Sequence, residues 1–217
     1  MNRATLVCFL HLGLLCSAAS AFAQDFSAEV FNVNGKDAVK AGKVYVKGSK
    51  MRIDRGDASP EASTPLMVVD LEAHTVTIMD PTSHTYLKSE MDADAGLSFF
   101  HISDGSNACT DLSKMAGMQS CKKAGNETIN GRQSSKYSGK SEDSKQITMW
   151  VDPEVNFIVK WQNGAEAGEL RNIKVAAQTA SLFDMPSDYH NAVKENMKEG
   201  AEKGADDNKE QSSPPPQ

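Results

Sequence analysis

Apolar and polar residues alternate with a period of two over many short segments of this chain. The clearest case is Gly42–Asp54 (GKVYVKGSKMRID), in which Gly48-Ser49 separates two alternating halves. Successive side chains of an extended strand leave opposite faces of a sheet, so this pattern predicts an antiparallel hairpin with one buried face. The residues predicted on that buried face are Val44, Val46, Met51 and Ile53.

Similar segments recur before and after this hairpin, each bounded by turn residues. The predicted strands are Phe26–Val33, Pro65–Leu71, Thr75–Asp80, Thr85–Ser89, Arg132–Gly139, Lys145–Asp152, Phe157–Gln162 and Gly168–Gln178. The Asn-Gly pairs at Asn34, Asn130 and Asn163 are typical of tight hairpin turns. Strands joined by consecutive hairpins form an antiparallel meander, and a large twisted sheet of this kind curls.

The alternation disappears between residues 92 and 121, where the pattern indicates helices instead. Asp92 or Asp94 would cap a first helix, and Asp111 would cap a second. Their apolar residues would face the sheet: Leu97, Phe100, Met115 and Met118. A curled sheet either closes on itself or has its concave face covered, and this helical section is the predicted cover.

The two ends of the chain differ in composition from the part between them. In residues 1–23, Arg3 is the only charged residue, Leu6–Leu15 is apolar, and Ala21-Phe22-Ala23 has small residues where a signal peptidase cleaves. This pattern predicts a secretory signal peptide, cleaved before Gln24. Residues 190–217 are rich in Lys, Glu, Gly and Asp and end in prolines, which predicts a disordered acidic, Pro-rich tail. One domain, residues 24–189, lies between them.

The overall charge narrows the choice of partners. The chain of 217 residues has a formal net charge of −6 at pH 7, and an acidic protein is poorly suited to nucleic acid or to anionic membrane surfaces. After the predicted signal peptide, no apolar run reaches the length of a transmembrane helix. We therefore expect no nucleic-acid partner and no transmembrane segment.

Two cysteines, Cys109 and Cys121, lie outside the predicted signal peptide. An exported chain meets oxidising conditions, under which a disulfide is the expected state of such a pair. The closed loop would be short, and the bond would hold the helical section in place.

The same region offers an alternative with soft-metal ligands. Imidazole, thiol and thioether groups together suit Cu(I), and they occur at His101, Cys109, Met115, Met118 and Cys121. Oxidised cysteines do not bind metal, and these spacings match no established metal motif. A copper site is therefore the less favoured interpretation, and no metal ligand is predicted.

Three stretches resemble the LolA/LolB-like superfamily of exported bacterial proteins. They are Lys43–Asp54, the pair Met79-Asp80-Pro81 and Thr85-Tyr86, and Leu182–Pro186. The resemblance covers Phe26–Tyr189 and is nearer to uncharacterised relatives than to the lipoprotein carrier itself. It implies a periplasmic protein, mainly β with minor α, whose curved antiparallel meander forms an unclosed half-barrel with a helical lid. In the carriers, an arginine on an early strand keeps the lid shut, and Arg52 matches that position.

The resemblance implies an apolar cavity between the concave face of the sheet and the lid. The residues predicted to line it are Val44, Val46, Met51, Ile53, Val76, Ile78, Met149, Val159 and Trp161 on the sheet, and Leu97, Phe100, Met115 and Met118 on the lid. Methionine side chains adapt to apolar ligands of different shape. The alternative is that the same residues only fill a core, because any sheet with one buried face produces such a set.

No nucleophile motif, phosphate-binding glycine loop or zinc signature occurs in the sequence. We therefore expect a non-enzymatic periplasmic protein without a cofactor, which binds a hydrophobic ligand such as a lipid or the acyl chain of a lipoprotein. The alternative is an interaction or sensing module that recognises an envelope protein and has a filled core. Bulky side chains that meet across the concave face would favour the filled core, whereas a gap would favour the ligand.

Overall fold

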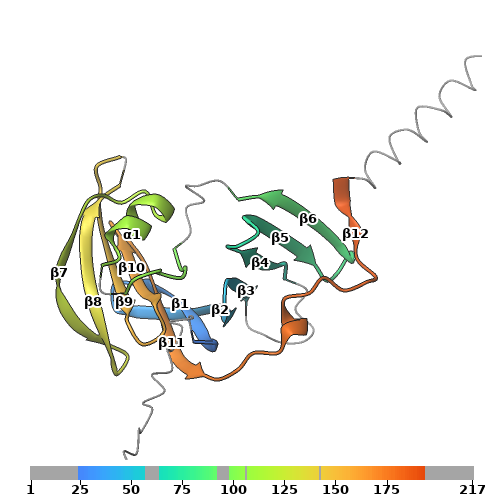
Figure 1. Cartoon of the computed structure of the whole chain (residues 1–217), viewed down its shortest axis with the longest axis horizontal. Helices are drawn as coiled ribbons and strands as arrows, with labels where there is room; N and C mark the ends of the chain where they lie inside the picture. Colours follow the sequence, from blue (N-terminus) through green and yellow to red (C-terminus); the bar gives the residue numbers. More distant parts are fainter. Residues whose placement is uncertain (1–23, 57–63, 92–97, 106, 142, 194–217) are drawn as a thin grey trace, which may run out of the picture.

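The computed structural model describes residues 24–56, 64–91, 98–105, 107–141 and 143–193, and within them the chain forms one twelve-stranded sheet (Figure 1). The strands are β1 (Phe26–Asn34), β2 (Asp37–Lys47), β3 (Lys50–Arg55), β4 (Leu66–Asp70), β5 (Thr75–Asp80), β6 (Thr85–Glu90), β7 (Gln119–Ile129), β8 (Arg132–Lys140), β9 (Gln146–Asp152), β10 (Phe157–Asn163), β11 (Glu166–Val175) and β12 (His190–Asn191). The helices are α1 (Cys109–Met115) and the 3₁₀ turn η1 (Ala180–Leu182). The predicted signal peptide and most of the predicted tail lie outside the described residues.

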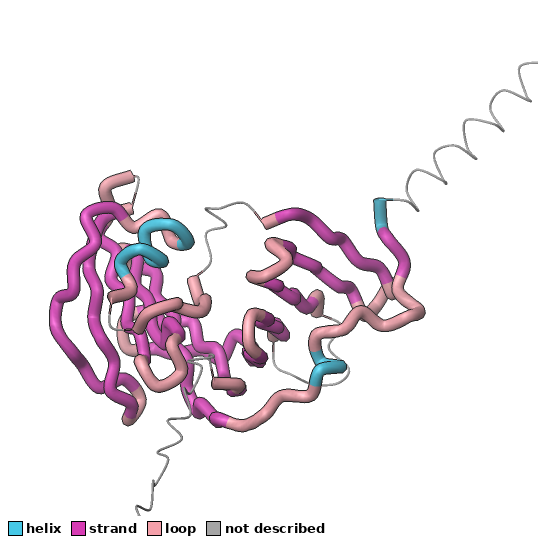
Figure 2. Tube along the Cα trace, viewed as in Figure 1, coloured by secondary structure: helices cyan, strands magenta, loops and turns pink. Residues whose placement is uncertain are grey.

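The sheet consists of two antiparallel meanders that share one long pairing. Its strand order is β12-β6-β5-β4-β3-β2-β1-β11-β10-β9-β8-β7, so β1 pairs with β11 and joins the strands from both parts of the chain. The edge strands β7 and β12 do not pair with each other, and the sheet curves without closing (Figure 2). The predicted fold class, mainly β with a curved, unclosed antiparallel sheet, is therefore confirmed.

The last strand extends the sheet beyond the predicted end of the domain at residue 189. β12 pairs with β6 in parallel, with His190 opposite Thr85 and Asn191 opposite Tyr86. The composition of residues 190–217 indicated only disorder, because a two-residue strand has no detectable alternation of its own. The sheet therefore includes the first two residues of the predicted tail.

The helical section contains one short helix in its described part. α1 has Ala108 at its N-cap, so Asp111 lies in the first turn and is not the predicted cap. Phe99 and Phe100 are buried in non-helical chain before α1, and Met118 follows its C-terminus. The predicted caps Asp92 and Asp94 lie outside the described residues. The described segment that covers the concave face is thus mostly irregular chain, and its buried side chains hold it against the sheet.

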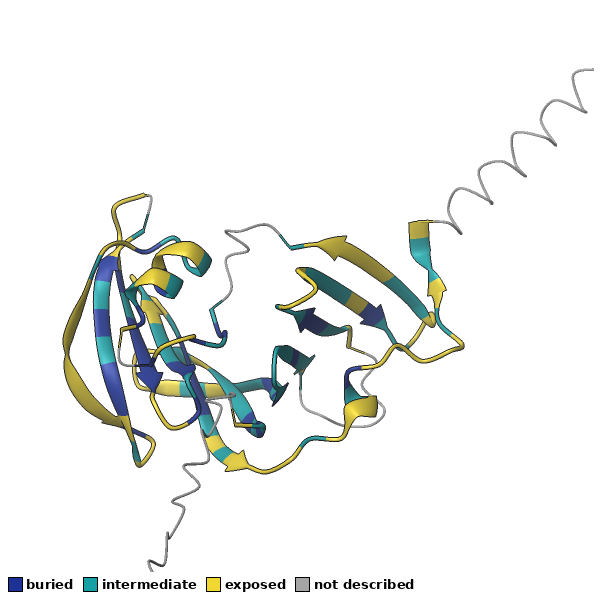
Figure 3. Cartoon of the chain, viewed as in Figure 1, coloured by how far each residue is buried: buried dark blue, intermediate teal, exposed yellow. Residues whose placement is uncertain are grey.

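The main core lies between this segment and the concave face of the sheet. Phe26 of β1 and Phe157 of β10 meet edge to face with their ring centroids 5.1 Å apart, a favourable aromatic arrangement. Leu112 of α1 is fully buried in the same cluster. The Tyr137 hydroxyl accepts a hydrogen bond from the backbone N–H of Ala108 at 3.3 Å, which ties the start of α1 to β8. Figure 3 shows the buried residues concentrated on β8 to β11, with β6 largely exposed.

The C-terminal segment covers the opposite, outer face of the other half of the sheet. Phe183 is buried against Val68 of β4 and Met79 of β5, and Leu182 and Tyr189 pack around them. Residues 181–189 therefore dock onto the domain through these apolar side chains. This docking leads the chain back to the edge of β6, where β12 begins.

The predicted disulfide is present between Cys109 and Cys121, whose Cα atoms are 5.5 Å apart. It joins the first residue of α1 to the third residue of β7 and closes the loop that contains the helix. Since α1 contributes one fully buried residue, Leu112, the covalent link supplies much of what holds the helix against the sheet.

Removal of this disulfide is expected to lower the melting temperature without changing the fold. A loop of this length contributes about 3 kcal/mol on the chain-entropy model, which corresponds to a decrease of roughly 6–12 °C for a domain of this size. The measurement is thermal unfolding by circular dichroism with and without dithiothreitol. The variant Cys109→Ala/Cys121→Ala is the control and should not respond to the reductant. An unchanged melting temperature of the reduced wild type would show that packing alone holds the loop.

Candidate functional site

A cavity of about 330 Å³ lies on the concave side, between the β4–β5 turn and α1. Its apolar wall consists of Leu71, Met91 and Met115. Polar side chains form the remaining wall: His74, His101, Ser103, Asp111 and Lys114. A small apolar space with a few polar groups at one side is the usual form of a site for a small ligand.

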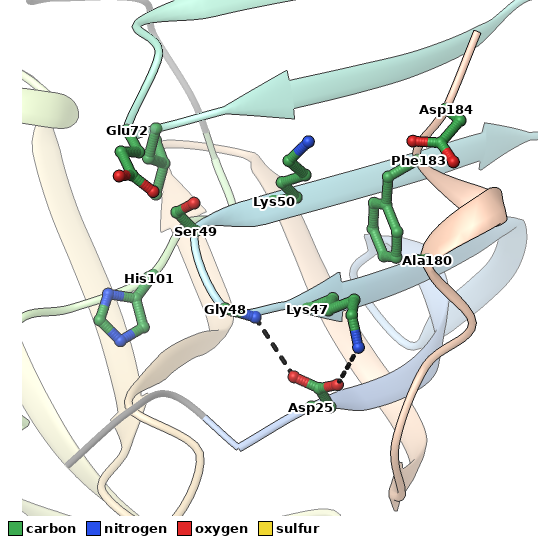
Figure 4. A pocket seen from close by; sticks show the side chains of 11 residues that line it. Asp25, Lys47, Gly48, Ser49, Lys50, Glu72, His101, Ala180, Phe183 and Asp184 are labelled. Carbon is green, nitrogen blue, oxygen red and sulfur yellow. Dashed lines mark hydrogen bonds and ion pairs between the residues drawn. The ribbon is translucent and has the colours of Figure 1, made fainter. Parts of the chain in front are cut away.

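A larger groove of about 770 Å³ adjoins this cavity and surrounds the β2–β3 turn (Figure 4). Leu71 and His101 line both spaces. In Figure 4, His101 lies at one end of the groove, and Phe183 with Asp184 lies at the other.

The wall of this groove is held by Asp25, which precedes β1. Its carboxylate accepts hydrogen bonds from Lys47 Nζ and from the backbone N–H of Gly48, both at 3.2 Å. The N–H of Gln178 reaches the same carboxylate at 3.2 Å. The start of the domain, the β2–β3 turn and the C-terminal segment therefore meet at one acidic side chain.

The backbone on both sides of His101 is fixed to the core strands. His101 forms an isolated antiparallel bridge with Phe157, and the N–H of Ile102 donates to the carbonyl of Asn156 at 2.8 Å. The neighbouring side chains of Phe100 and Ile102 are fully buried in the core. Since side chains alternate along extended chain, the imidazole of His101 is directed to the other side, where it lines the two spaces.

The imidazole of His101 has an unusual environment for a polar group. Its Nε2 atom is buried and has no hydrogen-bond partner within the described ranges. Burial lowers the pKa of His101 below the ordinary value of 6.5, while the negative charge of Asp111 opposes this effect. The ring is therefore neutral at pH 7, and one of its nitrogens is buried without a hydrogen-bond partner within the described ranges.

The charged groups of the cavity come from α1. Asp111 Oδ2 accepts hydrogen bonds from both the N–H and the hydroxyl of Ser103, each at 2.7 Å. Lys114 is exposed, one turn further along the helix. Lys47 and Lys50, which line the larger groove, pair with Asp25 at 3.2 Å and Asp70 at 3.5 Å. Lys114 has no ion pair in the described part of the chain, so its positive charge is available to a ligand.

Most predicted cavity residues lie in the filled core and do not line an open space. Six of them are buried in the main core: Val44, Val46, Met51, Phe100, Met118 and Met149. Four others are partly buried at its margin: Ile53, Val76, Met115 and Trp161. Met115 is the predicted residue that also lines the smaller cavity. Leu97 lies outside the described residues.

Trp161 illustrates how closely side chains pack against the sheet in this core. Its indole lies against the backbone of Gly168 on β11, where a Cβ would be 2.5 Å from the indole nitrogen. The side chain therefore lies along the sheet, and only glycine fits opposite it. In this part of the concave face, side chains pack as in a protein interior.

The prediction that Val159 faces the cavity is wrong. Val159 packs with Ile129 and Trp150 in a separate cluster, whereas Ile158 belongs to the main core. The register of β10 against β9 shifts between Ile158 and Lys160. The extra residue of such a bulge breaks the alternation that assigned Val159 to the face of Trp161.

The predicted contact of Arg52 with the lid is also wrong. Arg52 lies opposite Tyr45 and Val68, both of which belong to the cluster on the outer face. Its guanidinium binds the carboxylate of Asp54, with Nε 2.6 Å from Oδ1, and donates to the carbonyl of Leu182 at 3.0 Å. Arg52 therefore fastens the C-terminal segment to the sheet on the side away from α1.

Ile78 differs from the other predicted residues because it faces the concave side and no described residue buries it. It lies opposite Leu87 on β6, and the two side chains are 45% and 48% exposed. Val76, two residues earlier on the same face, still packs against the main core. The filled core thus gives way to exposed apolar surface toward the β6 edge.

Most residues that line the smaller cavity have no signal in the sequence. Leu71 and His74 belong to the β4–β5 turn, and Met91 follows β6, so none of them lies on a periodic apolar face. His101 was considered only as a soft-metal ligand. Its two cysteine partners form the disulfide, and the described residues contain no group of three or more His, Cys, Asp or Glu side chains placed to hold a metal ion.

Comparisons with known proteins show likeness in structure only. No family model and no curated protein sequence matches the chain. An uncharacterized conserved protein from Thermus thermophilus matches at 11% identity and a TM-score of 0.49, over 78% of this chain and 90% of that one. MucB in the Pseudomonas aeruginosa MucA/MucB complex matches at 13% identity and a TM-score of 0.46, over 77% of this chain and 57% of that one.

A lipoprotein-sorting protein is also among the matching structures. A putative outer membrane lipoprotein-sorting protein domain from Vibrio parahaemolyticus matches at 9% identity and a TM-score of 0.34, over 74% of this chain and 89% of that one. All three TM-scores are below 0.5, so the function must be argued from the residues of this chain. Within the described residues, no helix is both long and apolar enough to cross a bilayer.

The environment of His101 predicts a dependence of stability on pH. Its pKa is lowered in the folded state, so below about pH 6.5 the unfolded chain binds a proton that the folded chain excludes, and folding becomes less favourable. We expect His101→Gln to lose less stability than the wild type between pH 7.5 and pH 5.0 in urea unfolding. His74→Gln, at an exposed turn residue of the same cavity, is the control and should keep the wild-type dependence. Equal slopes for wild type and His101→Gln would contradict the prediction.

Proposed function

We propose that this chain is a non-enzymatic periplasmic protein that binds a hydrophobic ligand, a lipid or a single acyl chain, on the uncovered part of its concave face. The ligand would enter between β4–β6 and α1. It would contact Leu71, Met91 and Met115 of the smaller cavity and extend toward the exposed pair on β5 and β6. The location rests on the secretory pattern of residues 1–23 together with the disulfide, which is typical of oxidising compartments.

The observation that carries this proposal is the exposed pair Ile78 and Leu87. Their side chains are about half exposed and lie directly opposite each other, on the face that elsewhere in the sheet is a packed core. The cavity of about 330 Å³ lies on the same side, beside the turn between β4 and β5. Exposed apolar surface on the same side of the sheet as an open cavity suits an apolar ligand, because ligand binding removes this surface from water.

A second candidate function is supported by the filled part of the concave face. Val44, Val46, Met51 and Met149 are buried in a continuous core, as expected for a module that recognises another envelope protein through its surface. The two candidates differ in what occupies the surface of Ile78 and Leu87. Native mass spectrometry of the mature protein from a periplasmic preparation separates them. A bound, solvent-extractable species of several hundred daltons supports the lipid, whereas a bare chain that crosslinks to one protein in cells supports the partner.

The ligand proposal predicts that a charge at Ile78 weakens binding. Ile78→Glu would place a carboxylate where an apolar ligand lies, and the cost of desolvating that charge should weaken binding of the neutral probe Nile red at least about tenfold. Because Ile78 is 45% exposed, the melting temperature should change by no more than about 3 °C. Fluorescence titration measures the affinity.

Val39→Glu is the matched control, since Val39 is 68% exposed and lies on β2, outside both the cavity and the groove. It introduces the same charge into an exposed valine and should leave Nile red binding unchanged. Equal binding by wild type and Ile78→Glu would show that the probe binds elsewhere, and it would contradict the proposed site.

A further inference from the structure

The two edges of the sheet differ in how well they could accept a further strand. The register of β7 against β8 shifts twice, and bulges of this kind twist an edge strand away from additional pairing. β6 pairs with β5 along its whole length without a shift. Since β12 covers only Thr85 and Tyr86 of β6, the remaining part of this strand is a regular edge, and it is exposed (Figure 3).

The backbone of this uncovered part has hydrogen-bonding groups directed away from the sheet. The carbonyl of His84 accepts a hydrogen bond from the first residue of β12 at 2.8 Å, and the N–H of Met91 donates to the carbonyl of His74, beside β5, at 2.9 Å. The N–H and C=O of one residue point to the same side of a strand, and successive residues alternate. Lys88 and Glu90 therefore direct both groups to the free edge, where no described strand pairs with them.

The side chains of the same two residues carry opposite charges on one face. Tyr86 belongs to the cluster on the outer face, so Lys88 and Glu90, two and four residues later, lie on that face too. Both are exposed, and neither forms an ion pair within the described part of the chain. Leu87 and Met91 lie on the concave face, where Leu87 is 48% exposed.

A second copy of the chain is complementary to this edge in one register. Two β6 strands related by a twofold axis at Ser89 would run antiparallel, with Lys88 opposite Glu90 of the second copy and Glu90 opposite its Lys88. These are the residues whose backbone groups point to the free edge, so each pair would also exchange both of its main-chain hydrogen bonds. Opposite charges placed directly across two strands stabilise their pairing.

The neighbouring registers conflict with the charges or with β12. An axis at Lys88 would place two ammonium groups opposite each other, and an axis at Glu90 would do the same with two carboxylates, which is destabilising. An axis at Leu87 would require Tyr86 to pair with the second copy, although β12 already occupies this residue. The charges, the backbone directions and the free length of the strand therefore all favour Ser89.

We infer that two copies of this chain associate through β6, by antiparallel pairing of Leu87–Met91 about Ser89. The inference goes beyond the proposed function and does not depend on it. On the concave face, Leu87 would lie opposite Met91 of the second copy, which removes part of its exposed surface from water. Met91 also lines the smaller cavity, so each copy would place a leucine beside the cavity of the other.

This dimer is expected to be weak. The paired segment is much shorter than the roughly 20–30 residues a side of a standard protein interface. Association should therefore depend on concentration, and sedimentation velocity of the mature chain over a range of concentrations measures it.

The test exchanges the two charges. Lys88→Glu and Glu90→Lys each place like charges opposite each other at both pairs, so either variant alone should raise the dissociation constant of the dimer at least about tenfold. In an equimolar mixture the two variants meet with opposite charges at both pairs, and dimers should form as in the wild type. The double variant Lys88→Glu/Glu90→Lys should also dimerise. Because both residues are exposed, the variants are expected to keep the wild-type circular dichroism spectrum.

Lys123→Glu is the matched control, since it makes the same charge change at an exposed lysine of the other edge strand, β7. It should leave dimerisation unchanged. A wild type that stays monomeric up to roughly 1 mM would overturn the inference. So would a mixture of the two single variants that dimerises no better than its components, or a dimer that only Lys123→Glu disrupts. Nile red titration of dilute samples, in which the chain is monomeric, tests the proposed function separately from these outcomes.

Discussion

The pairing of β1 with β11 is the interaction on which the rest of the structure depends. It brings Phe26 opposite Val175 and Val30 opposite Leu170, and it joins strands that are separated by most of the domain. Without it, the chain would consist of two separate meanders with unprotected edges. The same pairing places Phe26 against Phe157, so the centre of the core forms only when the two meanders meet. Such long-range contacts must overcome a large loss of chain entropy, which makes cooperative folding of the whole sheet the expected behaviour.

The concave face that results from this pairing has two unlike parts. Over β8 to β11 and the first strands it is covered by residues 98–118, whose buried side chains Phe100, Ile102 and Leu112 complete a packed core. Over β5 and β6 this cover is absent among the described residues, and Ile78 and Leu87 remain about half exposed. The segment that covers one part is short and is fixed by the disulfide and by the bridge at His101. The boundary between filled and open surface is therefore set by the length and attachment of this segment.

The outer face is covered by a different element, the C-terminal segment. Residues 180–189 cross it with Phe183 buried against Val68 and Met79, and Arg52 holds the backbone of Leu182. This segment ends in β12 at the edge of β6, which shields the first two residues of an otherwise open edge strand. Because both ends of the domain meet at Asp25 and the β2–β3 turn, the groove is bounded by elements that are hydrogen-bonded to one another. A rigid boundary favours binding, since less conformational entropy is lost when a ligand enters.

The sequence by itself determined the local elements and their faces, because strand alternation and Asn-Gly turns depend on neighbouring residues only. The hairpin at Gly42–Asp54 and the inward face of Met149 followed from this period of two, and the pair Cys109–Cys121 followed from the expected compartment. Tertiary structure decided the rest. A bulge moved Val159 to the other cluster, and the register with β4 placed Arg52 on the outer face. The site around His101 depends on loops from three parts of the chain. No local sequence pattern encodes the distances between these loops, because the curvature of the whole sheet sets them.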